Sequence, residues 1–214
     1  MGVRAGRENR RRAVRVYCMK TVEVAGLIVR TLWPWLIYGW VGLEVVVSIA
    51  TRTRRSQGTL HDRGTQYIIW VIIVFSFFAA GWVAFPGADI RFNHQFLRLA
   101  AFVLILMGLA VRIAAIVTLG RSFSANVAIR STQTVLRKGL YRVVRHPSYL
   151  GMEIIFLAAG LHTHNWACLA VILVLPTSAV LYRIHVEEIA LLNAFGEEYA
   201  EYMRTTKRLI PGVY

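Results

Sequence analysis

Two polar clusters in the second half of the chain hold the residue types best suited to chemistry. The first, residues 139–151, places Tyr141, His146, Ser148 and Tyr149 among basic neighbours. Pro147 lacks an N–H group and disfavours helical angles at the residue before it, so we expect a helix to begin at Pro147. The first N–H groups of that helix would face the preceding loop and suit an anionic ligand. A basic loop entering a membrane helix has the same composition, so this interpretation stays open too.

The second cluster follows an apolar segment and contains Arg183, Glu187 and Glu188. Arg183 and Glu187 are four residues apart and would share one face of a helix. Taken alone, this pattern favours a helix salt bridge, or two acids placed at the positive end of a helix.

Composition indicates the class of protein that carries these clusters. The 214 residues are 57% apolar, with a mean hydropathy of +0.52, which is typical of an all-α integral membrane protein. The net charge of +14 lies at the edges of apolar segments, as it does beside anionic lipid, so we expect the bilayer and not nucleic acid as partner. Cys18 and Cys168 have neither metal-binding nor redox spacing, and we expect no metal site.

Hydrophobic segments predict about five transmembrane helices. Residues 163–165 are the whole gap between the last two, which predicts a tight antiparallel helical hairpin. The first helix of that hairpin is short for a span. An amphipathic acidic helix is expected from Arg183 to about Met203. His162 and His164, which flank the hairpin turn, are interpreted as surface residues. The five segments are residues 24–50, 67–85, 96–119, 148–162 and 166–183.

Loop charges predict the orientation. Residues 51–66, residues 120–147 and the C-terminal end lie on one side of the membrane, and together they carry most of the Lys and Arg outside the spans. The positive-inside rule makes that side cytoplasmic. It leaves the basic tail, residues 1–20, outside, unless the first segment is re-entrant and broken near Pro34.

Three ionisable residues, Glu44, Arg112 and Glu153, lie within apolar segments. Charges at such depth are costly, so they are expected to pair or to line a site. Glu44 with Arg112 is interpreted as a structural pair. Glu153 lies one helical turn after Tyr149 and is expected either to face the same cavity or to pair with a nearby arginine.

Together the clusters resemble the isoprenylcysteine carboxyl methyltransferase family. The resemblance rests on residues 133–151, on residues 183–202 and on the closing run from Arg208 to Pro211, in that order and spacing. Phospholipid N-methyltransferases share a looser form of the pattern. The resemblance covers residues 120–214 and makes them the catalytic region. Residues 1–20 then form a basic tail, and residues 21–119 form three membrane segments.

The resemblance implies a membrane enzyme that uses S-adenosylmethionine, in a pocket formed by the 120–148 loop and the C-terminal helix. Arg183 would hold the substrate carboxylate, and Glu153 is a further pocket candidate. Many relatives have His where Gln133 stands, which puts one contact to the cofactor in doubt. The residues implied to bind the cofactor are Gln133, Thr134, Val135, Leu136, Tyr141, His146, Pro147, Ser148, Tyr149, Glu187 and, more weakly, Glu188.

Carboxyl O-methylation of an isoprenylcysteine, or of a similar lipid-like carboxylate, is the function we expect. N-methylation of a phospholipid amine is the alternative, and it would need a base such as Glu153 or Glu187. An NADPH-dependent sterol-reductase-like protein and a non-enzymatic relic are weaker alternatives. The protein is expected to be multi-pass, in the plasma or inner membrane of a prokaryote or the endoplasmic reticulum of a eukaryote, with its active site facing the cytoplasm. The sequence leaves the oligomeric state and the acceptor open.

Overall fold

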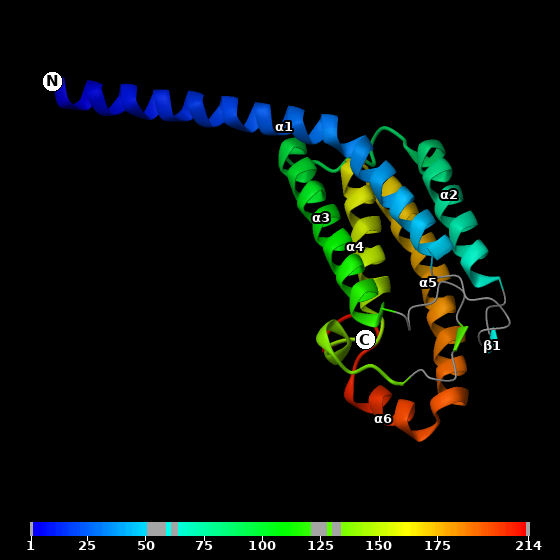
Figure 1. Ribbon diagram of the computed structural model, residues 1–214. Coiled ribbons are helices and arrows are strands. Elements are labelled where there is room, and N and C mark those ends of the chain that lie inside the picture. Colours follow the sequence, from blue (N-terminus) through cyan, green and yellow to red (C-terminus); the bar gives the residue numbers. More distant parts are fainter. Residues whose placement is uncertain (1, 51–58, 61–63, 121–127, 130–133, 213–214) are drawn as a thin grey trace.

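The computed structural model of the chain is a bundle of long helices (Figure 1). It describes residues 2–50, 59–60, 64–120, 128–129 and 134–212. Two two-residue strands, β1 (Thr59–Leu60) and β2 (Ala128–Ile129), pair antiparallel and connect two loops. A short 3-10 helix, η3, covers Gly139–Arg142. The described α-helices are α1 (Gly2–Ala50), α2 (Thr65–Val83), α3 (His94–Leu119), α4 (Pro147–His162), α5 (Trp166–Phe195) and α6 (Glu197–Thr205).

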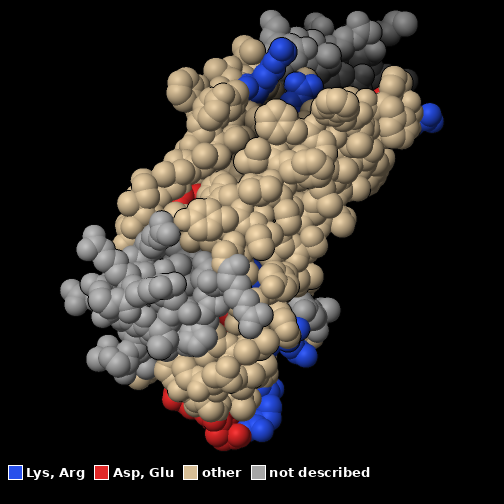
Figure 2. Space-filling model, turned by 90° about the vertical axis from the view of Figure 1, so that its right-hand side faces the viewer, with Lys and Arg blue, Asp and Glu red and all other residues tan. Residues whose placement is uncertain are grey.

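Four of these helices contain a stretch long and apolar enough to cross a membrane: Gly26–Ala50, Thr65–Val83, His94–Leu119 and Trp166–Phe195. Their outer faces carry large exposed apolar side chains such as Phe78 and Trp82, the second of them 91% exposed. Figure 2 shows charged residues gathered toward the two ends of the molecule, with a mostly uncharged middle. The chain is therefore a multi-pass integral membrane protein.

Five spans were expected, and four described helices are long and apolar enough to be candidates. The fifth, α4, has 16 residues and is too short to be counted. At 1.5 Å per residue it is about 24 Å long, shorter than a typical hydrocarbon core of about 30 Å. The hairpin that α4 forms with α5 is confirmed, and residues 163–165 join the two helices.

Other boundaries differ from the expectations. Helix α1 passes through Pro34 without ending, so the first segment is not broken there. Helix α1 begins at Gly2, so residues 2–20 of the expected basic tail belong to the same helix as the first apolar segment. The single amphipathic helix expected from Arg183 to about Met203 is instead two: the last part of α5, which ends at Phe195, and α6. Gly196, with φ 53°, separates them. His162 is half-buried and stacked on Trp33, not a surface residue. The division at residues 20 and 120 stays a prediction.

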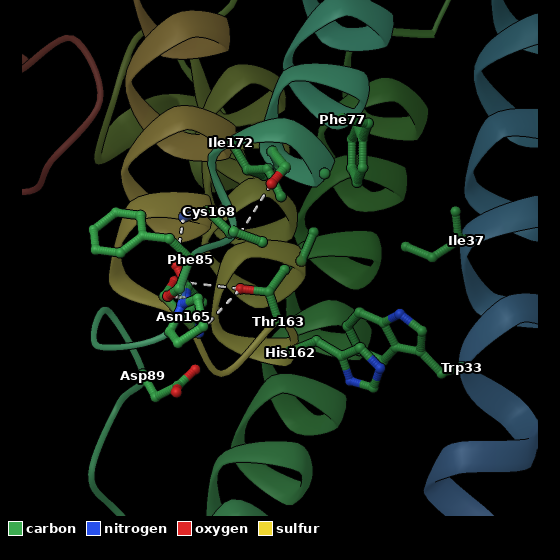
Figure 3. A pocket seen from close by; sticks show the side chains of 15 residues that line it. Trp33, Ile37, Phe77, Phe85, Asp89, His162, Thr163, Asn165, Cys168 and Ile172 are labelled. Carbon is green, nitrogen blue, oxygen red and sulfur yellow. Dashed lines mark hydrogen bonds between the residues drawn. The ribbon is translucent and has the colours of Figure 1, made fainter.

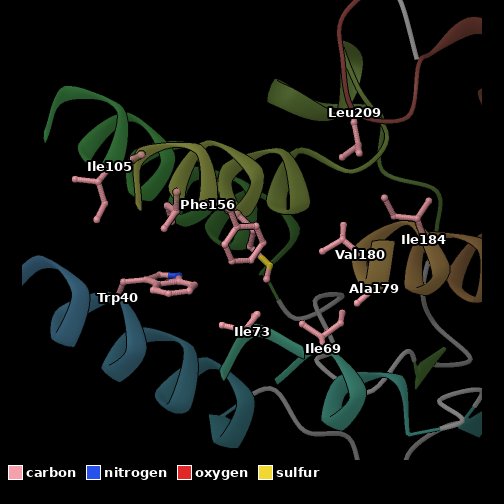
Figure 4. Packing of buried hydrophobic residues seen from close by; sticks show 12 residues of the cluster. Trp40, Ile69, Ile73, Ile105, Phe156, Ala179, Val180, Ile184 and Leu209 are labelled. Carbon is pink, nitrogen blue, oxygen red and sulfur yellow. The ribbon is translucent and has the colours of Figure 1, made fainter. Parts of the chain in front are cut away.

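The core fills the space between the helices at mid-depth (Figure 4). Trp40 of α1 meets Phe156 of α4 edge-on, with ring centroids 5.9 Å apart, and both side chains are almost fully buried. Ile73 of α2 and Val180 of α5 complete this layer. Burial of these side chains fixes α4 in the centre of the bundle.

The backbones of helices α3 and α4 approach each other closely at Gly108 and Gly151. A Cβ atom added to Gly151 would lie 2.8 Å from both Arg112 N and Gly108 O. A Cβ atom on Gly108 would lie 2.8 Å from Gly151 O. Small residues at such crossings let membrane helices pack closely. This contact sets the distance between α4, where the first polar cluster begins, and Arg112 of α3.

We predict that Gly151→Ala lowers the stability of the protein, because the new methyl group meets backbone atoms that cannot move independently. Overpacking of this kind costs about 1–3 kcal/mol. Thermal unfolding of detergent-purified protein measures the loss. The matched control is Gly42→Ala in α1, where an added Cβ has no atom of the described structure within 4 Å. Equal unfolding temperatures for the two variants would contradict the prediction.

Candidate active site

The first polar cluster lies where α4 begins, as the sequence predicted. Pro147 is the first residue of α4, and His146 before it has φ −122° and ψ 58°, outside the helical region. The 3-10 helix η3 leads into this turn, and its Tyr141 is buried. His146, Pro147 and Ser148 are buried as well. The N-terminal end of α4 is thus buried inside the bundle.

Tyr149 connects the two polar clusters. Its hydroxyl accepts a hydrogen bond from Arg183 Nε at 2.8 Å and donates one to Glu187 Oε2 at 2.9 Å. Arg183 is buried, with 4% of its surface exposed, and Glu187 is half-buried. The i, i+4 positions of Arg183 and Glu187 on α5 therefore present both charges to one phenol on α4.

Arg183 also contacts a third helix, α2. Its Nη1 donates to the hydroxyl of Thr65, the first residue of α2, at 2.7 Å. Thr65 is 1% exposed. Sequence analysis did not find Thr65, because a single threonine before an apolar segment has no pattern that separates it from a helix start. The contact places the Arg183 guanidinium at the junction of α2, α4 and α5.

Glu188 is at the centre of a separate buried network. Its Oε1 accepts from Arg145 Nε at 3.0 Å and lies 3.3 Å from His146 Nε2. Its Oε2 accepts from Arg208 Nε at 2.9 Å. Oε1 thus contacts the loop before α4, and Oε2 contacts the segment after α6. We call this segment, residues 206–212, the closing segment. The sequence motifs contain Arg145 and Arg208, but sequence analysis had given neither a role.

The closing segment is fastened to the same loop through its backbone. Arg145 N donates to Lys207 O at 2.8 Å, and His146 N donates to Arg208 O at 3.0 Å. The Arg145 guanidinium also donates to the carbonyls of Met203 and Thr206. These bonds satisfy polar groups that the turn before α4 would otherwise bury unpaired.

Helix α6 is hydrogen-bonded to η3. The Tyr202 hydroxyl donates to the carbonyl of Tyr141 at 2.6 Å. Burial raises the pKa of Tyr202 to about 12, so its phenol keeps the proton that this bond requires. The Tyr141 hydroxyl in turn donates to the carbonyl of Ala115 at 3.4 Å. Tyr141, a residue implied for cofactor binding, is therefore held between α3 and α6.

The expected pair of Glu44 and Arg112 is confirmed. Arg112 Nε and Nη2 donate to the two oxygens of Glu44 at 2.6 and 2.7 Å, a bidentate geometry. Arg112 Nη1 also donates to the carbonyl and the hydroxyl of Ser148. One buried cation thus joins α1 and α3 to the first turn of α4.

The remaining candidates lie around this centre. Glu153 is one turn deeper along α4, where its Oε2 accepts from Thr177 at 2.6 Å; its Oε1 is buried without a partner in the described structure. Thr134 is exposed, and Val135 and Leu136 are half-buried in the segment before η3. Gln133 lies outside the described residues. The structure therefore brings together His146, Tyr149, Arg183, Glu187 and Glu188.

The site combines groups of both charges at one bundle end. Within the described part of the chain, no group of three or more His, Cys, Asp or Glu side chains could hold a metal ion. Arg183 presents a cation with several N–H donors, and Glu187 presents a half-buried carboxylate beside it. Such a pair can hold an anionic and a cationic or hydroxyl-bearing ligand next to each other.

Comparisons with known proteins find relatives. A family model described as the isoprenylcysteine carboxyl methyltransferase (ICMT) family matches residues 100–193. Protein-S-isoprenylcysteine O-methyltransferase B of Arabidopsis thaliana is 30% identical over 160 residues, which are 69% of this chain and 75% of that protein. Protein-S-isoprenylcysteine O-methyltransferase A of the same plant is 32% identical over 143 residues, 61% of this chain and 66% of that protein.

A solved structure has the same fold. It is that of a eukaryotic intramembrane Ras methyltransferase, an isoprenylcysteine carboxyl methyltransferase. It matches with a TM-score of 0.52 at 24% identity, and the match covers 71% of this chain and 54% of that one. At this identity the likeness concerns the fold alone.

We predict that Glu188→Ala strongly destabilises the protein, because Arg145 and Arg208 would lose the carboxylate that both contact. Removing one partner of a buried ion pair costs about 3–5 kcal/mol. Thermal unfolding measures the loss. Glu197→Ala is the matched control: it removes an ion pair to Arg204 whose two side chains are 80% and 65% exposed, and it should change little. An unchanged unfolding temperature in Glu188→Ala would show that the network does not hold the closing segment.

Proposed function

The chain belongs to the isoprenylcysteine carboxyl methyltransferase family, and on that premise we propose that it methylates the carboxylate of an isoprenylcysteine or a similar lipid-like acid. The observation that carries the proposal is the Arg183–Tyr149–Glu187 chain of hydrogen bonds at the junction of α2, α4 and α5. It sets a cation for an anionic acceptor beside a carboxylate for the cofactor.

The family uses S-adenosylmethionine, and the chain is a membrane methyltransferase with that cofactor. The residues present fit it. Glu187 is half-buried and its Oε2 accepts from Tyr149, which positions the carboxylate for a ribose hydroxyl or an amine of the cofactor. The first turn of α4 presents the N–H groups of Ser148 and Tyr149, which suit the carboxylate of the amino acid part.

The proposed binding set keeps the residues implied by the family, except Glu188. His146, Pro147, Ser148 and Tyr149 line the start of α4, and Tyr141 lies behind them. Thr134, Val135, Leu136 and Gln133 would cover the remaining side. Glu188 would act through His146, whose Nε2 it contacts, and not by touching the ligand.

Arg183 is the proposed acceptor-binding residue. A guanidinium can hold a carboxylate by two parallel N–H donors, and burial strengthens such charge-assisted bonds. Thr65 and Tyr149 fix its orientation from two helices. An acceptor with an apolar tail would approach from the bilayer side of the junction.

The chemistry asks for positioning and not for a base. When bound, S-adenosylmethionine supplies a methyl group from a sulfonium, so a carboxylate oxygen gains the methyl group while the carbon–sulfur bond breaks. A carboxylate is already ionised near neutral pH, and no proton has to be removed. The contribution of Arg183 and Tyr149 is therefore proximity and orientation in a site closed to water.

We further propose five crossings of the membrane: the four long helices and, between α3 and α5, the shorter α4. Helices α1 to α5 run alternately in opposite directions (Figure 1), which brings the last residues of α1, α3 and α5 and the first residues of α2 and α4 to one side. In the sequence these helix ends adjoin residues 51–66, residues 120–147 and the C-terminal end. The excess of Lys and Arg in these segments supports a cytoplasmic position for that side and for the active site.

We predict that the purified protein binds S-adenosylmethionine and S-adenosylhomocysteine, and that Glu187→Ala loses this binding without unfolding. Calorimetric titration measures affinity, with NADPH as a negative control. Glu198→Ala, which changes an exposed acid on α6, should bind as the wild type does. Wild-type affinity in Glu187→Ala would remove Glu187 from the binding set. Binding of NADPH alone would overturn the methyltransferase assignment.

We predict that Arg183→Ala keeps cofactor affinity and loses methylation of a farnesylated cysteine analogue by roughly a hundredfold or more, as expected when one partner of a buried charge pair is removed. Arg183→Lys should restore little, since an ammonium cannot form the paired fork. Methyl transfer is measured with radiolabelled cofactor, and phosphatidylethanolamine is offered as a competing amine acceptor. Preferential methylation of that amine would favour N-methylation, and full activity of Arg183→Lys would exclude bidentate holding.

A further inference from the structure

A cavity lies at the end of the bundle opposite the candidate active site. Figure 3 shows the side chains that line it. Its volume is about 600 Å³, which is in the range of small-molecule sites. Four helices line it with mostly apolar side chains: Trp33 and Ile37 of α1, Phe77 and Gly81 of α2, Ala159 of α4 and Ile172 of α5.

This cavity is separate from the active site. It includes His162 at the C-terminal end of α4, whereas Tyr149 lies in the first turn of that helix. At 1.5 Å per residue the two positions are about 20 Å apart along the axis. Trp40 and Phe156, almost fully buried, fill the bundle between them. A ligand of the cavity is thus not the reacting acceptor.

The cavity opens to the surface at the end of α2. Gly81, Ala84 and Phe85 line it and are also exposed. The two helices at its opening pack against different neighbours, α1 on α3 and α2 on α5. Because both helices are long and apolar enough to cross a membrane, we expect the opening to face the bilayer.

One end of the cavity is polar, and most of its groups are already satisfied. The Asn165 side chain accepts from Ala167 N and Cys168 N, and the Thr163 hydroxyl donates to Gly160 O. Two groups differ. His162 Nδ1 is buried without a hydrogen bond in the described structure, although its ring stacks on Trp33 at 3.8 Å. The Asp89 carboxylate lines the same end and is exposed.

Charge at that end selects the kind of headgroup. Among the described lining residues Asp89 is an acid, and none is Lys or Arg. A carboxylate in the wall favours an ammonium at the tip of a headgroup and disfavours a headgroup with a net negative charge.

We propose that this cavity binds the acyl chain and amine-bearing headgroup of a zwitterionic phospholipid, from the leaflet opposite the candidate active site. The apolar walls of α1 and α2 take the chain, and Asp89 pairs with the ammonium. His162 Nδ1 gains a hydrogen-bond partner at the headgroup level. This inference is independent of the methyl acceptor.

The test uses full-length protein in nanodiscs that contain phosphatidylethanolamine with a diazirine in one acyl chain. After irradiation, mass spectrometry maps the labelled peptides. We expect labelling of the segments around Trp33 and Phe77, at least several-fold above that by phosphatidylglycerol with the same chain. Equal labelling by the two lipids would overturn the proposal and would mean annular lipid alone.

Two variants separate the cavity from the general lipid surface. Gly81 lines the cavity, and a Cβ added there has no described atom within 4 Å, so Gly81→Phe should narrow the cavity and reduce labelling several-fold. Gly39→Phe is the matched control, because Gly39 of α1 also faces open space but does not line the cavity. Wild-type labelling in Gly81→Phe would overturn the proposal.

The exposed position of Asp89 provides a variant that should not disturb folding. Asp89→Asn should label with both lipids to the same extent, because it removes the charge that distinguishes an ammonium from a glycerol headgroup. Retention of the full preference in this variant would exclude Asp89 as the recognising group. S-adenosylmethionine affinity, measured in parallel, should equal that of the wild type.

Discussion

A single buried carboxylate, that of Glu188, organises the catalytic end of this protein. It contacts Arg145, His146 and Arg208, which come from the loop before α4 and from the closing segment after α6. Charges buried in this way are costly unless each is paired. Loss of one of these contacts should therefore weaken the packing of α5, the loop before α4 and the closing segment against one another. The backbone bonds from Arg145 and His146 to residues 207 and 208 depend on that arrangement.

The same constraint operates deeper in the bundle. Arg112 is surrounded by apolar helices and is satisfied by Glu44 of α1 and by Ser148 of α4. An arginine at such depth would otherwise oppose insertion. Its contact with Ser148 fixes the first turn of α4, while Gly108 and Gly151 allow α3 and α4 to approach closely enough for that contact. Packing and electrostatics thus set the position of one helix end.

The resulting geometry gives two neighbouring acids different surroundings. Glu188 is enclosed by cations, whereas Glu187 is half-buried and shares the Tyr149 hydroxyl with Arg183. Because Tyr149 links Arg183 to Glu187, a shift of either charged group moves the other through one phenol. This coupling would keep the proposed acceptor and cofactor positions at a constant separation, which is what methyl transfer by proximity requires.

Local pattern determined much of this protein. Hydrophobic segments predicted the membrane helices, Pro147 predicted the start of α4, and the three-residue gap predicted its hairpin with α5. The high cost of an unpaired charge within an apolar segment was enough to predict the pair of Glu44 and Arg112. Tertiary structure decided what depends on distant segments: the contact of Thr65 with Arg183, the enclosure of Glu188, and the cavity beside His162. Such contacts arise where helices far apart in sequence cross, and no periodicity within one helix encodes its neighbour.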